Sequence, residues 1–158
     1  MTQGEDMSAP TRNDEPKLNR RDELAVSGAA MSGAPWKTAG AAGAVVTGAD
    51  LIFHLVGGHL DVPTALSAGT VALFAVAGGG ALVRGHAGRA MRWARANPWR
   101  FALLPGVAAA AVVFVLSVVL GSSGVIGGVF TAVWHGAVAY GLTGVAGSVA
   151  GSRKRRSA

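Results

Sequence analysis

The chain has 158 residues, of which 51% are apolar, 14% are charged and none is cysteine, and its formal net charge is +6. Without cysteine there can be no disulfide, thiolate metal site, iron–sulfur cluster or cysteine nucleophile. The 14 Lys and Arg residues all lie within three segments, 1–37, 84–100 and 153–156. These basic residues flank apolar runs and do not form the basic face of a folded module, so we expect anionic lipid as the partner and no nucleic acid.

Residues 1–35 come first and are polar. They mix six acidic with four basic residues, and no apolar residue recurs at helical or strand spacing before Ala34. A segment of this composition buries too little apolar surface to offset the entropy lost on folding. We therefore predict a disordered cytoplasmic tail over residues 1–35.

A transmembrane domain is predicted over residues 36–152. Its four spans are expected at about 38–58, 63–83, 101–120 and 125–149. Residues 62–83 carry no charge over 22 positions, and a helix of that length covers the hydrocarbon thickness of roughly 30 Å. Residues 101–152 carry none over 52 positions, which is enough for two crossings and a turn. The predicted fold class is all-α, a polytopic bundle of four transmembrane helices.

The distribution of positive charge predicts the orientation. Lys and Arg next to a span are retained on the cytoplasmic side of the membrane. With four spans all 14 fall on one side, whereas omission of the first span would place five of them outside. We therefore expect a plasma-membrane protein with both termini in the cytoplasm, residues 153–158 forming a basic cytoplasmic tail.

The basic segment 84–100 joins the second and third spans. Its arginines share one broad arc of a helical wheel, and small apolar residues lie opposite. This pattern predicts a short helix on the membrane surface that breaks at Asn97-Pro98. A loop whose only role is to fix topology would give the same charges. The residues expected to contact lipid headgroups are Arg89, Arg92, Trp93, Arg95 and Trp99.

Small residues are expected to hold the spans together, since lipid provides no hydrophobic drive between helices. In the fourth span such residues recur at steps of four, interrupted by one aromatic residue: Gly128, Ala132, Gly136, Tyr140, Gly144 and Ser148. Ala39 and Gly43 form a shorter pair in the first span. We interpret both as contacts within the bundle, with self-association as the alternative.

Four ionisable side chains lie inside the predicted spans: Asp50, His54, His135 and Tyr140. An Asp near the centre of a membrane costs about 2.5–3.5 kcal/mol on insertion scales, so it needs a partner. Counting from the inner ends of the first and fourth spans puts Asp50 and His135 at similar depth, and Thr131 approaches the level of His54. If these two spans touch, Asp50, His54, Thr131 and His135 form a polar cluster.

Three interpretations of this cluster stay open. It can have a purely structural role, in which a hydrogen-bonded Asp50–His135 contact fixes helix pairing. It can serve as a proton or cation relay in a small transporter or channel-like oligomer that uses Asp50, His54 and His135. It can also be a ligand site, with His54 and His135 on haem or Asp50, His54 and His59 on a cation. Fixed-spacing motifs for such ions are absent, and we expect neither a cofactor nor a metal.

The sequence contains no catalytic motif. There is no Gly-x-Ser-x-Gly elbow and no phosphate-binding loop, so we expect no enzyme and no catalytic residue. The best functional expectation is a non-enzymatic accessory, assembly or regulatory subunit, with other membrane-protein subunits or a second copy as partners. The alternative is a small proton- or cation-coupled transporter.

Several short motifs resemble small four-span membrane proteins of unknown function from actinobacteria. They are Gly48-Ala49-Asp50-Leu51, Leu60-Asp61-Val62-Pro63, the Arg- and Trp-rich inner loop and a His in the fourth span. The resemblance covers roughly residues 36–152 and implies a four-span architecture without implying any activity.

Overall fold

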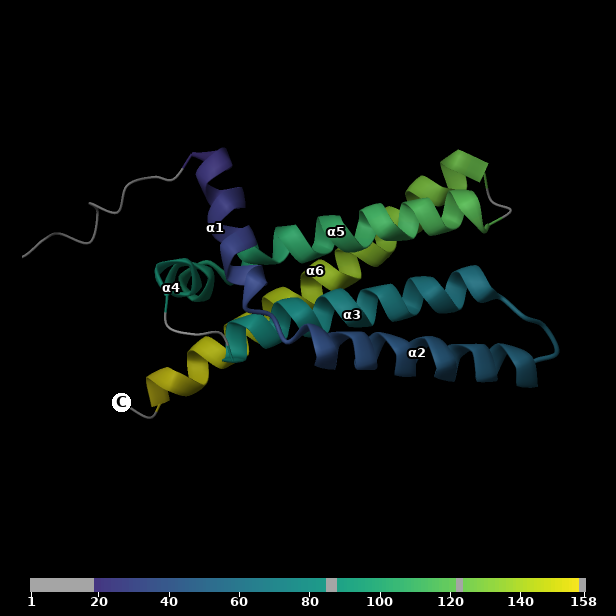
Figure 1. Cartoon of the computed structure of the whole chain (residues 1–158), viewed down its shortest axis with the longest axis horizontal. Coiled ribbons are helices and arrows are strands. Elements are labelled where there is room, and N and C mark those ends of the chain that lie inside the picture. Colours follow the sequence, from purple (N-terminus) through teal and green to yellow (C-terminus); the bar gives the residue numbers. More distant parts are fainter. Residues whose placement is uncertain (1–18, 85–87, 122–123, 157–158) are drawn as a thin grey trace, which may run out of the picture.

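The computed structural model describes residues 19–84, 88–121 and 124–156, which form six α-helices (Figure 1). The helices are α1 (Arg20–Ser32), α2 (Trp36–Val56), α3 (Val62–Arg84), α4 (Arg89–Ala96), α5 (Pro98–Val119) and α6 (Gly124–Arg156). Four of them, α2, α3, α5 and α6 over Gly124–Ala150, are long and apolar enough to cross a membrane. The all-α class and four candidate spans are thus confirmed, and these helices indicate a multi-pass membrane protein.

The four long helices form two antiparallel hairpins, α2 with α3 and α5 with α6 (Figure 1). Helix α3 is central because it contacts α2, α5 and α6, whereas α2 contacts only α3 among the described helices. The connections α2–α3 and α5–α6 lie at one end of the bundle, and α1, α4 and the C-terminal end of α6 lie at the other (Figure 1). The described parts of the three basic segments, residues 19–37, 84, 88–100 and 153–156, therefore belong to the same end.

Glycine permits the closest helix approaches. A Cβ atom on Gly136 of α6 would lie 2.9 Å from the carbonyl oxygen of Gly106 on α5, so neither position has space for a side chain. Further along α6, Gly144 lies under the indole ring of Trp99. The small-residue stripe of the fourth span thus packs against α5 within the bundle, as predicted.

An apolar core at the basic end joins α1 and α4 to the bundle. It includes Met31 near the end of α1, Met91 and Ala94 of α4, Leu82 of α3 and Phe101 of α5, all buried. Removing an apolar side chain such as Met from water contributes about 1.5–3 kcal/mol. The predicted short helix and its break at Asn97-Pro98 are present, but protein covers the apolar face of α4 that was expected to meet lipid.

The predicted disordered tail is also partly wrong. Residues 20–32 form α1, which contacts α3, α4 and α5, while residues 1–18 lie outside the described residues. Ser27, Ala30, Met31 and Ala34 recur at steps of three, one and three, and all four are buried. Asp22 and Glu23 lie in the first turn of α1, where their negative charges interact favourably with the positive end of the helix dipole and stabilise the helix. The segment folds because its short apolar face docks on other helices.

Two helix boundaries differ from the prediction. Helix α5 begins at Pro98 rather than near residue 101, since proline at the first position already has helical φ and needs no amide donor. Pro105 therefore lies inside α5 and not in its first turns. At the other end of the chain the backbone of α6 stays helical to Arg156, so the basic segment 153–156 extends the helix.

Candidate functional site

The candidate site lies on the face of α2 that packs against α3. Ala39, Gly43, Thr47, Asp50 and His54 follow one another at steps of four, four, three and four, which places them on one side of the helix. Ala39 and Gly43 are buried, and a Cβ on Gly43 would lie 2.9 Å from the carbonyl oxygen of Gly69 on α3. The first half of this face thus packs closely against the α3 backbone. Its second half carries the polar pair Asp50 and His54.

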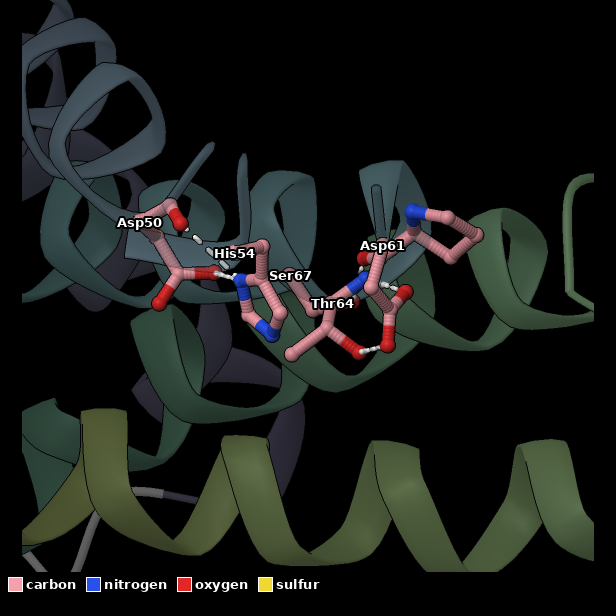
Figure 2. A network of polar contacts seen from close by, with 6 residues as sticks. Asp50, His54, Asp61, Thr64 and Ser67 are labelled. Atoms are coloured by element: carbon pink, nitrogen blue, oxygen red, sulfur yellow. Dashed lines mark hydrogen bonds and ion pairs between the residues drawn. The ribbon is translucent and has the colours of Figure 1, made fainter. Parts of the chain in front are cut away.

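Asp50 and His54 contact each other one helical turn apart (Figure 2). Nδ1 of His54 lies 2.9 Å from the backbone carbonyl oxygen of Asp50 and 3.1 Å from its Oδ2. A carbonyl oxygen can only accept, so Nδ1 carries the proton and donates it there, leaving Nε2 as the acceptor of the neutral ring. When His54 is protonated, the same geometry forms an ion pair.

The carboxylate of Asp50 is only partly satisfied by this contact. Its Oδ2 is buried and makes no hydrogen bond with any described residue, because the Nδ1 proton of His54 is directed to the backbone carbonyl. The side chains are nevertheless 30% exposed for Asp50 and 21% for His54. The pair therefore sits at the edge of the α2–α3 contact, between protein and the surroundings of the bundle.

A second polar group continues from this pair toward the α2–α3 connection (Figure 2). The rings of His54 and His59 meet edge to face, with centroids 5.0 Å apart. Asp61 caps α3: its Oδ1 accepts from the backbone amide of Thr64 at 3.1 Å and its Oδ2 from the Thr64 hydroxyl at 2.7 Å. The side-chain hydrogen bond from Thr64, with smaller effects from its amide and from the two imidazoles, lowers the pKa of Asp61.

The structure does not bring Thr131 and His135 to this pair. Nδ1 of His135 donates to the carbonyl oxygen of Thr131 at 2.8 Å, and the Thr131 hydroxyl donates to that of Gly127 at 3.0 Å. Both bonds stay within α6, which does not contact α2 in the described chain. The predicted cluster of Asp50, His54, Thr131 and His135 is therefore wrong, because it required the first and fourth spans to touch, and α2 and α6 do not touch in the described chain.

The residues predicted to contact lipid headgroups have mixed surroundings. Arg89 and Arg92 are exposed, whereas Trp93 packs against the core at the basic end. Nε of Arg95 donates to the carbonyl oxygen of Leu82 at 2.9 Å and so satisfies an acceptor in the last turn of α3. Trp99, half exposed, also packs against Tyr140, with ring centroids 5.5 Å apart.

No group of three or more His, Asp or Glu side chains in residues 19–84, 88–121 and 124–156 is arranged to hold a metal ion. The alternative of a cation bound by Asp50, His54 and His59 thus finds no support in the geometry.

The ion pair between Glu23 of α1 and Arg100 of α5 was not predicted. The sequence signals this contact only through spacing: Glu23 lies four residues before Ser27 and seven before Ala30, on the buried face of α1.

Comparisons of the chain with protein-family models, with curated proteins and with solved structures each found no match. The resemblance to small actinobacterial four-span proteins therefore stays a prediction.

Proposed function

We propose that this protein is a non-enzymatic accessory, assembly or regulatory subunit of the plasma membrane, and that it contacts its partner through Asp50 and His54 on α2. The observation that carries the proposal is the partly exposed polar pair on α2, a long helix that packs against α3 alone among the described helices. Both termini are assigned to the cytoplasm, because the described parts of all three basic segments belong to the same end of the bundle.

The position of α2 alone does not require a partner protein. Its outward side chains are apolar, with Phe53 and Val56 strongly exposed, and lipid chains cover such residues as well as another helix does. The Asp50 carboxylate is different. Lipid offers it no hydrogen bond, and an Asp inside a span costs about 2.5–3.5 kcal/mol. A neighbouring transmembrane helix with a donor group at this depth would remove that cost.

A second copy of the chain is a poorer partner than a different protein. In a symmetric dimer the same residue comes from each copy at the same depth, and the two Asp50 carboxylates face each other when they lie near the two-fold axis. Like charges repel strongly in an apolar environment. A helix with a hydroxyl, amide or basic side chain meets no such penalty, and we therefore infer a heteromeric contact.

Transport is the second candidate function, and one observation favours it. A row of titratable side chains runs from inside α2 to the α2–α3 connection: Asp50, His54 and Asp61 are shown in Figure 2, and the ring of His59 meets that of His54. Inward of Asp50, however, the same face of α2 presents Thr47, Gly43 and Ala39, which do not titrate. The row thus covers only one half of the span, which supports the accessory function over proton transfer across the membrane.

Site-specific photocrosslinking in the native host tests the proposal. A photoreactive amino acid at Val46 or Phe53, which flank Asp50 on α2, is expected to give an adduct with a second, different protein. Asp50→Leu should abolish that adduct, and Asp50→Asn should keep most of it, because the amide still forms hydrogen bonds. The matched control position is Val115 on the exposed face of α5. Adducts with lipid alone, or only with another copy of the chain, would reject the heteromeric contact.

A further inference from the structure

A groove lies between α1 and α5 at the basic end of the bundle. It has a volume of about 850 Å³. Arg20, Glu23, Leu24 and Ser27 line it from α1, and Arg100, Leu103, Leu104 and Val107 line it from α5. Helix α1 projects sideways from the bundle rather than along it (Figure 1), and side chains of both α1 and α5 line the groove.

The lining of this groove changes from charged to apolar along α5. Arg100 lies in the first turn of α5 and forms an ion pair with Glu23. Leu103 and Val107 follow one and two turns further into the span, and both are exposed. An occupant that fits must therefore carry a charged group at one end and an apolar chain at the other.

We propose that the groove binds one anionic phospholipid, with its phosphate group near Arg20 and Arg100 and an acyl chain along Leu103 and Val107. Two cations and one anion line the charged end, which favours a negatively charged headgroup. Although Arg100 is paired with Glu23, its side chain stays 63% exposed, so its guanidinium can also reach a phosphate oxygen. The apolar end lies beside α5, where acyl chains of the bilayer already run.

Glu23 gives this site a distinctive property. It competes with the lipid phosphate for Arg100, because both are anionic acceptors of the same guanidinium. Loss of the Glu23 charge should therefore strengthen binding of an anionic lipid, even though it removes a contact that holds α1 on α5. A purely structural role of the ion pair predicts the opposite or no change. This inference is independent of the proposed contact through α2.

The test measures lipid dissociation constants by native mass spectrometry of the full chain in mild detergent. Phosphatidylglycerol and phosphatidylcholine with the same acyl chains are compared. The protein is expected to bind phosphatidylglycerol more tightly than phosphatidylcholine. Arg20→Gln is expected to weaken phosphatidylglycerol binding roughly fivefold, which corresponds to about 1 kcal/mol for one basic residue near an anionic surface. Glu23→Gln should tighten phosphatidylglycerol binding. The matched control Arg84→Gln removes an exposed arginine at the end of α3, outside the groove, and should change little.

Three results would overturn the inference. They are equal affinity for the two lipids, equal losses in Arg20→Gln and Arg84→Gln, or phosphatidylglycerol binding that is unchanged or weaker in Glu23→Gln. Inorganic phosphate distinguishes a lipid site from a simple anion site. If it displaces phosphatidylglycerol at comparable concentration, the apolar half of the groove contributes nothing and the lipid assignment fails.

Discussion

Gly43 of α2 and Gly69 of α3 meet backbone to backbone. A Cβ on Gly43 would lie 2.9 Å from the Gly69 carbonyl oxygen, and a Cβ on Gly69 would lie 2.7 Å from that of Gly43. Because α3 is the only described helix that α2 contacts, this pair fixes how α2 and its Asp50–His54 pair sit on the bundle.

We predict that Gly43→Ala separates the two helices and destabilises the protein. Its methyl group would press on backbone, which cannot rotate away, and overpacking of this kind costs about 1–3 kcal/mol. Thermal unfolding in detergent, followed by circular dichroism, measures the effect. Gly40→Ala and Gly48→Ala are matched controls on the same helix, since a Cβ at either position meets nothing within 4 Å. Equal losses in all three variants would show that the close approach does not matter.

Asp61 makes stability depend on pH at the start of α3. Its pKa is lowered from the ordinary value of 3.8, so the capping carboxylate stabilises the folded state above that pH and loses this effect as pH falls through the lowered value. We predict that Asp61→Ala costs about 1 kcal/mol at pH 7, as expected for loss of an N-cap. The difference from the unaltered protein should shrink as pH falls below about 3.8.

The same thermal unfolding series at pH 7 and pH 3 provides the measurement for Asp61. Asp61→Asn is the control, since its amide oxygen can still cap the helix and carries no titrating charge. A gap between the unaltered protein and Asp61→Ala that stays constant between the two pH values would contradict the assigned role of the carboxylate.

The sequence was sufficient to predict the four spans, because long uncharged stretches such as 101–152 leave few alternatives to crossing the membrane. The similar depth of Asp50 and His135 was inferred by counting residues from the ends of the spans, and it stays a prediction. Contact between these two residues was wrongly expected, since a count along the chain says nothing about which helices touch. Helix α1 was missed because its apolar face is short, and its burial depends on Met91 and Phe101 from distant parts of the chain.

Thr143 is fully buried where α6 meets α3 and α5. Its Oγ1 makes no hydrogen bond with any described residue, and its side chain fits against Gly78 and Pro105. We predict that Thr143→Val leaves stability unchanged or raises it, because valine keeps the shape and removes a hydroxyl without a partner.

Thr143→Ala is the matched variant for this position. It removes the hydroxyl and a methyl group together, so the space beside Gly78 is no longer filled and stability should fall. The unfolding midpoints of the two variants in detergent are compared directly. A loss in Thr143→Val as large as that in Thr143→Ala would mean that the hydroxyl forms a hydrogen bond in the membrane.

The central claim is that the chain crosses the membrane four times with its basic end in the cytoplasm. The chain contains no cysteine, so Leu60→Cys in the α2–α3 connection and Ala96→Cys at the end of α4 each carry a single reactive thiol and change no basic residue. Both positions are exposed. With a membrane-impermeant maleimide, we predict labelling of Leu60→Cys in intact cells and of Ala96→Cys only after the membrane is broken. Labelling of both from the same side, or in the reverse order, would contradict the account.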